Sequence, residues 1–201
     1  MKTWLAETQH AFSSLIPLVW EEQDQLDEAA QRLTSLEAAT DAGYLRAQAL
    51  LDDLDDEGLG TFQYWETYFG ADKDRFHAAI ATDEKQQVLE ARAFARSSLA
   101  SAILQIAKQG LSAVHGKLDA VPAGREIHGV PIKDIIWQAR NQSMHWEEGK
   151  PHNGVVGCFE KLAQAEPVFS NYGSRSLAFE VIHLLGWRDA AAFERDLTEI
   201  G

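Results

Sequence analysis

The chain has 201 residues with an apolar fraction of 45%, which is enough length and hydrophobicity to bury a core. It carries 31 Asp and Glu against 18 Lys and Arg, a formal net charge of −13. A protein that coats duplex nucleic acid needs a basic surface to displace counterions from the phosphates, so this charge excludes a general DNA-coating role.

The charge is unevenly distributed along the chain. Residues 1–90 hold 6 Lys and Arg and 19 Asp and Glu, whereas residues 91–201 hold 12 of each. Within the second part, residues 91–150 contain 8 basic and 5 acidic groups. Any contact with phosphate is therefore expected in residues 91–150.

Apolar residues at three- and four-residue spacings predict helices in the first part of the chain. A first helix is expected to begin at Pro17, a residue suited to a first turn. Thr40 or Asp41 is expected to cap a second helix that stops at Gly58. The aromatic residues 59–70 are expected to form a brief helix or turn packed under the bundle.

The second part is expected to contain a long central helix capped by Thr82 or Asp83 and ending near Gly116. Two Pro and several Gly indicate that residues 116–131 form a loop. Four further helices are expected at residues 131–148, 155–165, 176–186 and 189–200, the last capped by Asp189. No clear period-two strand is found, so the fold class is all-α, a bundle of about six to eight helices.

The predicted helix 131–148 has three distinct faces on a helical wheel. One face is an expected core stripe, made of Ile132, Ile135, Ile136, Ala139, Ser143 and Trp146. The opposite face carries hydrogen-bonding groups, namely Asp134, Gln138, Asn141 and His145. Arg140 lies on a third face between Trp137 and Met144, a combination that suits a protein contact.

The run Arg140-Asn141-Gln142-Ser143-Met144-His145 resembles a known motif. It has the Arg, polar residue, three variable residues and His of the HEPN superfamily (higher eukaryotes and prokaryotes nucleotide-binding domains). The earlier run AFARSSLASAILQIAKQG is similar to the family's preceding helices. The resemblance covers about residues 82–165, which we interpret as a HEPN-like core. Residues 1–81 are interpreted as an acidic helical region packed on this core, and residues 166–201 as a C-terminal helical pair, all within one compact domain.

The resemblance implies a bundle that commonly dimerises and brings two motifs to a shared cleft for RNA or nucleotide. In many members it also implies a metal-independent endoribonuclease that needs no cofactor. His145 would then be the general acid and base, and Arg140 would stabilise charge on the phosphate. Asn141 would orient His145 or a phosphate oxygen. The expected partners are a second copy of the chain and a cognate antitoxin or regulator.

Two features of the motif bear on this expectation. Arg140 and His145 are five residues apart and diverge by about 140° around a helix axis, so a site shared between two protomers is the more natural arrangement. Glu147 stands where some toxin members carry Tyr, and Glu147 and Glu148 place negative charge where RNA would approach.

The alternative is a non-catalytic helical interaction or regulatory module with a degenerate HEPN-like site. Its acidic first 90 residues would either mask the cleft or bind a basic partner. RNA cleavage in EDTA that depends on Arg140 and His145 would distinguish the enzyme from this module.

The remaining candidates are weaker. Arg125 and His128, in the loop before the motif, would help to bind phosphate or else belong to a solvated loop. The acidic residues 52–57 lack the spacing of a calcium loop, and the other histidines show no ligand pattern, so no metal is expected. Cys158 is expected to be buried, and the six Trp to be chiefly core. With one cysteine, no apparent signal peptide and no long apolar run, a cytoplasmic protein without a membrane span is expected.

Overall fold

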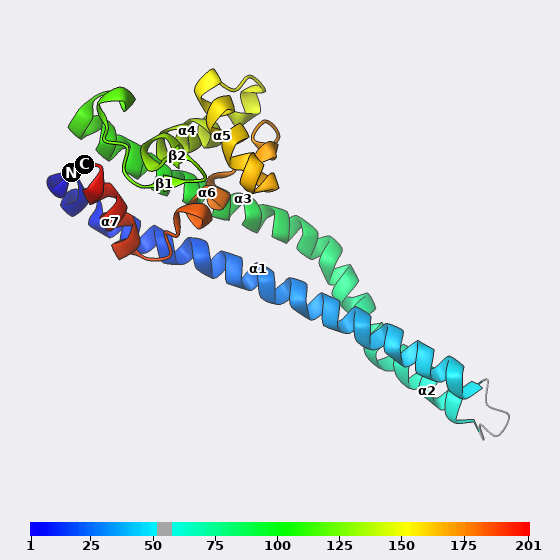
Figure 1. The fold of residues 1–201 in the computed structure, drawn as a ribbon. Coiled ribbons are helices and arrows are strands. Elements are labelled where there is room, and N and C mark those ends of the chain that lie inside the picture. Colours follow the sequence, from blue (N-terminus) through cyan, green and yellow to red (C-terminus); the bar gives the residue numbers. More distant parts are fainter. Residues whose placement is uncertain (52–57) are drawn as a thin grey trace. The chain divides into compact units, whose positions relative to one another are not determined.

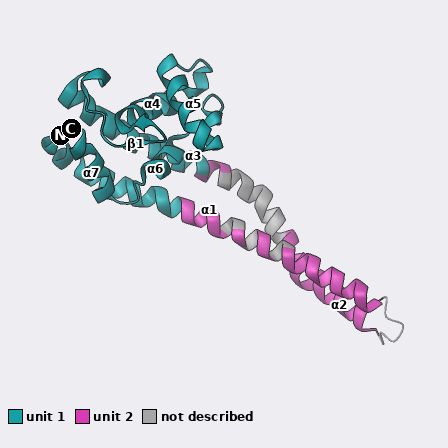
Figure 2. Ribbon diagram, viewed as in Figure 1, with its two compact units in different colours: residues 1–22, 93–201 teal, residues 23–92 magenta. Residues whose placement is uncertain are grey.

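The computed structural model describes the backbone of residues 1–51 and 58–201, and the side chains in these ranges except those of 29, 30, 32, 33, 36, 37 and 77–89. The chain forms two compact units (Figure 2). Unit 1 comprises residues 1–22 and 93–201, and unit 2 comprises residues 23–92. These boundaries do not coincide with the ranges 1–81, 82–165 and 166–201 inferred from the sequence, because two long helices each contribute to both units.

The described residues are almost entirely helical, which confirms the all-α class (Figure 1). Seven α-helices fall in the described ranges: α1 Lys2–Leu51, α2 Leu59–Thr67, α3 Lys73–His115, α4 Ile132–His145, α5 Asn153–Ala165, α6 Ala178–Leu185 and α7 Ala190–Glu199. A π-helical turn, Tyr68–Asp72, follows α2. Short 3₁₀ turns lie at Leu118–Ala120, Trp146–Glu148 and Pro167–Asn171.

The first helix differs from its prediction at both expected ends. α1 begins at Lys2 and continues through Thr40 and Asp41, so Pro17 starts no helix and neither of the other two caps one. A proline inside a helix removes a hydrogen bond and costs about 3 kcal/mol. Pro17 lies on the exposed face, and buried Ile16 and Val19 on either side of it anchor the helix in the core of unit 1. Tertiary burial therefore offsets the local penalty.

The long helix α3 also begins earlier than expected. It starts at Lys73, so Thr82 and Asp83 lie within it rather than at its start, and their side chains are outside the described residues. Its predicted end is confirmed, since Gly116 has a φ of 74° and its N–H donates to the Ser112 carbonyl at 2.9 Å. A glycine in this left-handed conformation is a common helix terminator.

The predicted loop 116–131 contains a small hairpin that the sequence analysis missed. Strands β1 (Glu126–Ile127) and β2 (Val130–Pro131) pair antiparallel, with Ile127 opposite Val130. The two turn residues His128 and Gly129 have φ values of 51° and 72°. Positive φ at both positions matches the right-handed twist of paired strands. Two-residue strands are too short to show an alternating pattern.

The later helices agree closely with their predictions. α4 to α7 occupy the expected segments. Gly149 takes a left-handed conformation after the 3₁₀ turn that follows α4, and Gly186 does so after α6. The Asp189 carboxylate accepts a hydrogen bond from the Ala192 N–H at 2.8 Å, so the predicted cap of α7 is confirmed. Local capping chemistry was sufficient to locate these elements.

The core of unit 1 joins the two ends of the chain, which lie side by side (Figure 1). The rings of Phe12 in α1 and Phe193 in α7 are 4.8 Å apart, and both residues are fully buried. Trp20 Nε1 donates to the Trp187 carbonyl at 2.8 Å. In the described part of the chain, no helix is both long and apolar enough to cross a bilayer.

Candidate functional site

Helix α4 positions the motif residues through its apolar stripe. The predicted core residues Ile132, Ile135, Ile136, Ala139 and Ser143 are buried, and Trp146 is half-buried. With this stripe inward, the polar face turns outward, where Asn141 is half-buried and His145 is exposed. The predicted core stripe is therefore confirmed, and the four residues of the polar face are half-buried or exposed.

Arg140 contacts helix α3. Its Nε donates to Gln105 Oε1, and its Nη1 donates to Asn141 Oδ1 at 3.3 Å. Asn141 therefore uses its carbonyl oxygen on Arg140, and no hydrogen bond joins it to His145 among the described residues. The expectation that Asn141 orients His145 has no contact to support it.

A second cation, Lys108 of α3, lies beside Arg140 and was not singled out from the sequence. Its ammonium is 4.4 Å from the ring centroid of Trp137. Burial lowers the pKa of Lys108, and the positive charge of Arg140 lowers it further. Among the described residues no carboxylate forms an ion pair with either cation. Two adjacent unneutralised cations favour an anion.

His145 is held by a carboxylate that sequence analysis treated as unfavourable. Its Nδ1 lies 2.7 Å from Glu148 Oε1, three residues further on. No hydrogen bond to its Nε2 is found in the described part of the structure. A carboxylate on one ring nitrogen fixes the tautomer and leaves the other nitrogen for proton transfer. The signal available in the sequence was the three-residue spacing.

Arg140 and His145 belong to different surfaces of unit 1. Arg140 is bound to Gln105 on α3 and does not line the depression that His145 forms with Asn141, His152 and Tyr172. That depression has a volume of about 10 Å³, room for about one water. Within one chain, the two motif residues do not form a common site.

A much larger groove lies between α3, the end of α4 and the start of α6. Its volume is about 790 Å³, within the range of small-molecule sites. Aromatic, hydroxyl and charged side chains line it, including Phe94, Arg96, Ser97, Gln105, Met144 and Phe179. The Arg96 guanidinium lies 4.0 Å from the centroid of the Phe179 ring. The groove adjoins the cation pair through Gln105, which contacts Arg140 and lies one helical turn before Lys108.

Gln142, a variable position of the motif, organises one wall of the groove. It is buried, its Nε2 donates to the carbonyls of Tyr172 and Arg175 at 2.8 and 2.7 Å, and its Oε1 accepts from the Leu177 N–H at 2.9 Å. These bonds fix the segment that carries Arg175 and Ser176, both in the groove lining. All three partners are backbone atoms at least 30 residues away, so no sequence signal revealed this role.

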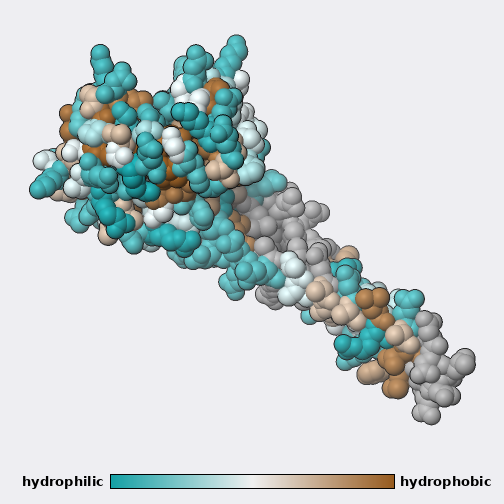
Figure 3. Space-filling view, viewed as in Figure 1, coloured by the Kyte–Doolittle hydropathy of each residue, from teal (hydrophilic) through white to brown (hydrophobic). Residues whose placement is uncertain are grey.

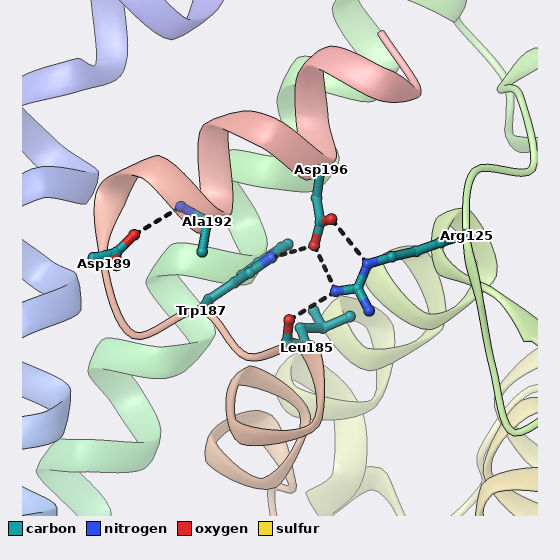
Figure 4. A network of polar contacts seen from close by, with 6 residues as sticks. All are labelled: Arg125, Leu185, Trp187, Asp189, Ala192 and Asp196. Atoms are coloured by element: carbon teal, nitrogen blue, oxygen red, sulfur yellow. Dashed lines mark hydrogen bonds and ion pairs between the residues drawn. The ribbon is translucent and has the colours of Figure 1, made fainter.

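Arg125 has a structural partner within unit 1 (Figure 4). Its Nε and Nη2 donate to the two carboxylate oxygens of Asp196 at 2.9 and 2.8 Å, and Nη2 also donates to the Leu185 carbonyl at 2.7 Å. The hydrogen bond to Asp196 raises the pKa of Arg125. Trp187 Nε1 completes the network with a 2.8 Å bond to Asp196 Oδ2. The guanidinium is thus committed to a carboxylate, although a phosphate contact was predicted for it.

His128 lies apart from the motif as well. Its Nε2 is 3.1 Å from Glu166 Oε1, and both side chains are partly exposed. In the described part of the chain, neither Arg125 nor His128 makes a hydrogen bond to Arg140 or His145. The two predicted phosphate ligands are therefore not joined to the motif by any such contact.

The other candidates are placed as follows. Cys158 is buried as expected, and burial raises its thiol pKa to about 12. No group of three or more potential metal ligands occurs in the described residues. Trp20 and Trp187 are buried, but Trp65 is 49% exposed, which contradicts a core role for it.

Comparisons with known protein families, with curated proteins and with solved structures find no match to this chain. The HEPN resemblance therefore stays a prediction that depends on the residues quoted for it.

Proposed function

We propose that the protein binds RNA or a nucleotide on the α3–α4 surface of unit 1, with phosphate at Arg140 and Lys108. The observation that carries this proposal is a set of contacts that brings the two cations to one surface. Arg140 binds Gln105, one helical turn before Lys108 on α3, and Lys108 lies on the ring of Trp137, one turn before Arg140 on α4. Neither cation has a carboxylate partner in the described residues. A phosphate would neutralise both, and the Nη2 of Arg140 makes no hydrogen bond in the described structure.

The adjoining groove has features that suit a nucleoside. Its aromatic side chains, Phe94 and Phe179, offer faces on which bases stack. Ser97, Ser98 and Ser101 also belong to the lining, and serine hydroxyls can donate to and accept from the polar groups of a nucleoside.

Cleavage is the further step that the motif predicts. His145 would remove the proton from an RNA 2′-hydroxyl, which attacks the adjacent phosphorus and forms a cyclic phosphate. The leaving 5′-oxygen would then take a proton from the protonated His145, while Arg140 stabilises the charge on the phosphate. Because Arg140 and His145 of one chain lie on different surfaces, this chemistry requires a second copy that brings its His145 to the first copy's Arg140.

Binding is tested by fluorescence anisotropy with labelled single-stranded RNA, at several salt concentrations and in EDTA. Replacing Lys108 or Arg140 with Ala is expected to weaken binding about tenfold. The slope of the logarithm of the binding constant against the logarithm of the salt concentration should become shallower by about one, because one phosphate contact is lost. Lys161→Ala, an exposed cation on α5, is the matched control and should leave affinity within about twofold. Equal affinity of all four proteins would contradict the phosphate site.

Cleavage is tested on the same RNA by gel electrophoresis in EDTA. His145→Ala and Arg140→Ala are expected to abolish cleavage, while His145→Ala keeps the affinity for RNA. Sedimentation velocity should show a dimer under cleaving conditions. Absence of cleavage by the wild-type protein, with binding intact, would remove the ribonuclease step and leave the binding function.

The second candidate is the non-catalytic interaction module. The observation in its favour is that Arg140 and His145 each contact a side chain of their own chain, Gln105 and Glu148 respectively. Failure of both the binding and the cleavage experiments would favour this candidate.

A further inference from the structure

Five aromatic residues of unit 2 are exposed on α2 and the π-helical turn that follows it. Phe62, Trp65 and Phe69 are 65%, 49% and 65% exposed, and Tyr64 and Tyr68 are also exposed. Their spacings of three and four residues place them on adjoining stripes of one helical surface. We call these five residues the aromatic face. The exposure of all five contradicts the prediction that residues 59–70 pack under the bundle.

The interior of unit 2 explains why these rings point outward. The buried residues among the described side chains of this unit are all small, namely Thr40, Gly43, Ala47, Gly60 and Thr67. A Cβ on Gly60 would come within 2.6 Å of the Leu51 backbone nitrogen, and one on Gly43 within 2.5 Å of Thr67 Oγ1. Helices α1 and α2 thus approach too closely to admit large side chains between them.

The aromatic face is ordered by contacts within the unit. Trp65 stacks on Phe69 with centroids 5.7 Å apart and meets Tyr64 and Tyr68 edge-on at 5.5 and 5.7 Å. Tyr44 of α1 donates to Asp72 at 2.6 Å, which ties the end of the π-helical turn to α1. Turns of this type are frequent at functional sites. A preordered apolar surface loses little conformational entropy when a partner binds.

The charge of unit 2 selects the partner. The unit has 16 Asp and Glu against 6 Lys and Arg, and two of these carboxylates, Glu66 and Asp72, belong to α2 and the π-helical turn themselves. Figure 3 shows apolar surface next to strongly hydrophilic surface on this unit. Like charge disfavours a second copy of the same unit and an anionic lipid surface. Exposed Trp and Tyr faces attract ammonium and guanidinium groups, and acidic neighbours strengthen that preference.

We infer that the aromatic face binds a cationic amphipathic segment of a partner protein. Apolar side chains of the segment pack on Phe62, Trp65 and Phe69. Its Lys and Arg side chains meet the aromatic rings and the exposed carboxylate of Glu66. This site is separate from the α3–α4 surface and does not depend on the nucleotide-binding proposal.

The test measures binding of the full-length protein to a fluorescein-labelled amphipathic peptide of leucine and lysine by fluorescence anisotropy. The same peptide with glutamate in place of lysine should not bind, and added salt should weaken binding of the lysine peptide. Replacing both Trp65 and Phe69 with Ala is expected to weaken binding about tenfold or more. Glu66→Lys, which reverses a charge three residues before Phe69, is expected to weaken it about fivefold.

Leu18→Ala is the control, because Leu18 is 46% exposed, lies in unit 1 and takes no part in the α3–α4 groove. It should leave peptide affinity unchanged, and circular dichroism should show native helix content in every variant. The inference would be overturned if the wild-type protein, the Trp65→Ala/Phe69→Ala variant and the Glu66→Lys variant bound the lysine peptide with equal affinity. Sedimentation velocity tests whether a second copy of the chain occupies the face, and vesicle flotation tests an anionic lipid surface. A wild-type oligomer that becomes monomeric in the Trp65→Ala/Phe69→Ala variant would overturn the inference. Binding to anionic vesicles that this variant loses would overturn it as well.

Discussion

Arg125 and Asp196, 71 residues apart in the chain, form a paired contact in which two guanidinium nitrogens donate to two carboxylate oxygens. The Asp196 side chain is nearly buried, and the indole N–H of fully buried Trp187 shares one of its oxygens. Paired charge-assisted hydrogen bonds of this geometry are among the stronger polar contacts in proteins. A residue that looked like a phosphate ligand thus fastens the β1 hairpin to α7.

Asp196→Ala is expected to reduce the free energy of unfolding by about 2–4 kcal/mol, because it leaves the Trp187 N–H buried without an acceptor and removes the Arg125 contact. Urea denaturation followed by circular dichroism measures this. Arg125→Ala should also destabilise, and the double variant should fall short of the sum by about 1 kcal/mol or more. Asp189→Ala, which removes only the α7 cap, should cost about 1 kcal/mol and add independently to Arg125→Ala. Strict additivity of Arg125→Ala and Asp196→Ala would contradict the network.

Gln142→Ala is expected to cost about 2–4 kcal/mol, since it opens a buried space and leaves three backbone groups without partners. Amide hydrogen exchange should accelerate in residues 172–177. Gln164→Ala, at an exposed glutamine on α5, is the control and should change stability by about 0.5 kcal/mol or less. Similar effects from the two substitutions would show that Gln142 has no special role.

Two glycines of unit 1 are expected to respond in opposite directions to alanine. In a helix, Gly→Ala is favourable by about 1 kcal/mol when the methyl group has room. A methyl group added at Gly157 in α5 would meet nothing within 4 Å. Gly157→Ala should therefore stabilise by up to about 1 kcal/mol. At Gly110 in α3, the methyl would lie 2.6 Å from the Trp4 ring, whose Nε1 is fixed by a hydrogen bond to the Ile106 carbonyl. Gly110→Ala should destabilise by about 1–3 kcal/mol in the same urea assay.

Tyr44 is expected to ionise well above the ordinary pKa of a tyrosine. The hydrogen bond to Asp72, burial and the Asp72 charge raise its pKa from 10.0 to about 12. The folded state therefore holds this proton more tightly than the unfolded state. The stabilisation is complete below pH 10 and is lost as the pH rises from 10.0 towards 12. Phenolate absorbance should show a late step that Tyr44→Phe removes, and stability of the wild type should fall more steeply than that of Tyr44→Phe in this window. Identical profiles would refute the assignment.

Cys158 is expected to resist thiol reagents in the native protein, because burial raises its pKa to about 12 and keeps the thiol protonated. The absorbance assay with a disulfide reagent should show negligible reaction until urea unfolds unit 1, and then one equivalent. Rapid modification of the folded protein at neutral pH would contradict its burial.

Much of the helical structure followed from local sequence. The stop at Gly116 and the Asp189 cap depend on interactions within one or two turns, and both predictions are confirmed. The ends of α4 to α7 lie within three residues of the predicted ends. The stripe of α4 was also predicted, because its period matches that of a helix. Prediction failed for α1, where burial of Ile16 and Val19 outweighs the local signals of Pro17.

The candidate site shows the same division. Helix geometry alone requires that Arg140 and His145, five residues apart on one helix, diverge around its axis, so this could be predicted from the sequence. Their neighbours could not be predicted, because Gln105 and Lys108 come from α3. The pairing of Arg125 with Asp196 likewise joins chain segments far apart in sequence. Likewise, the sequence displays the aromatic residues 62–69, but their exposure follows from the close approach of α1 and α2 at small residues. Contacts over such separations depend on packing in three dimensions, which local periodicity does not encode.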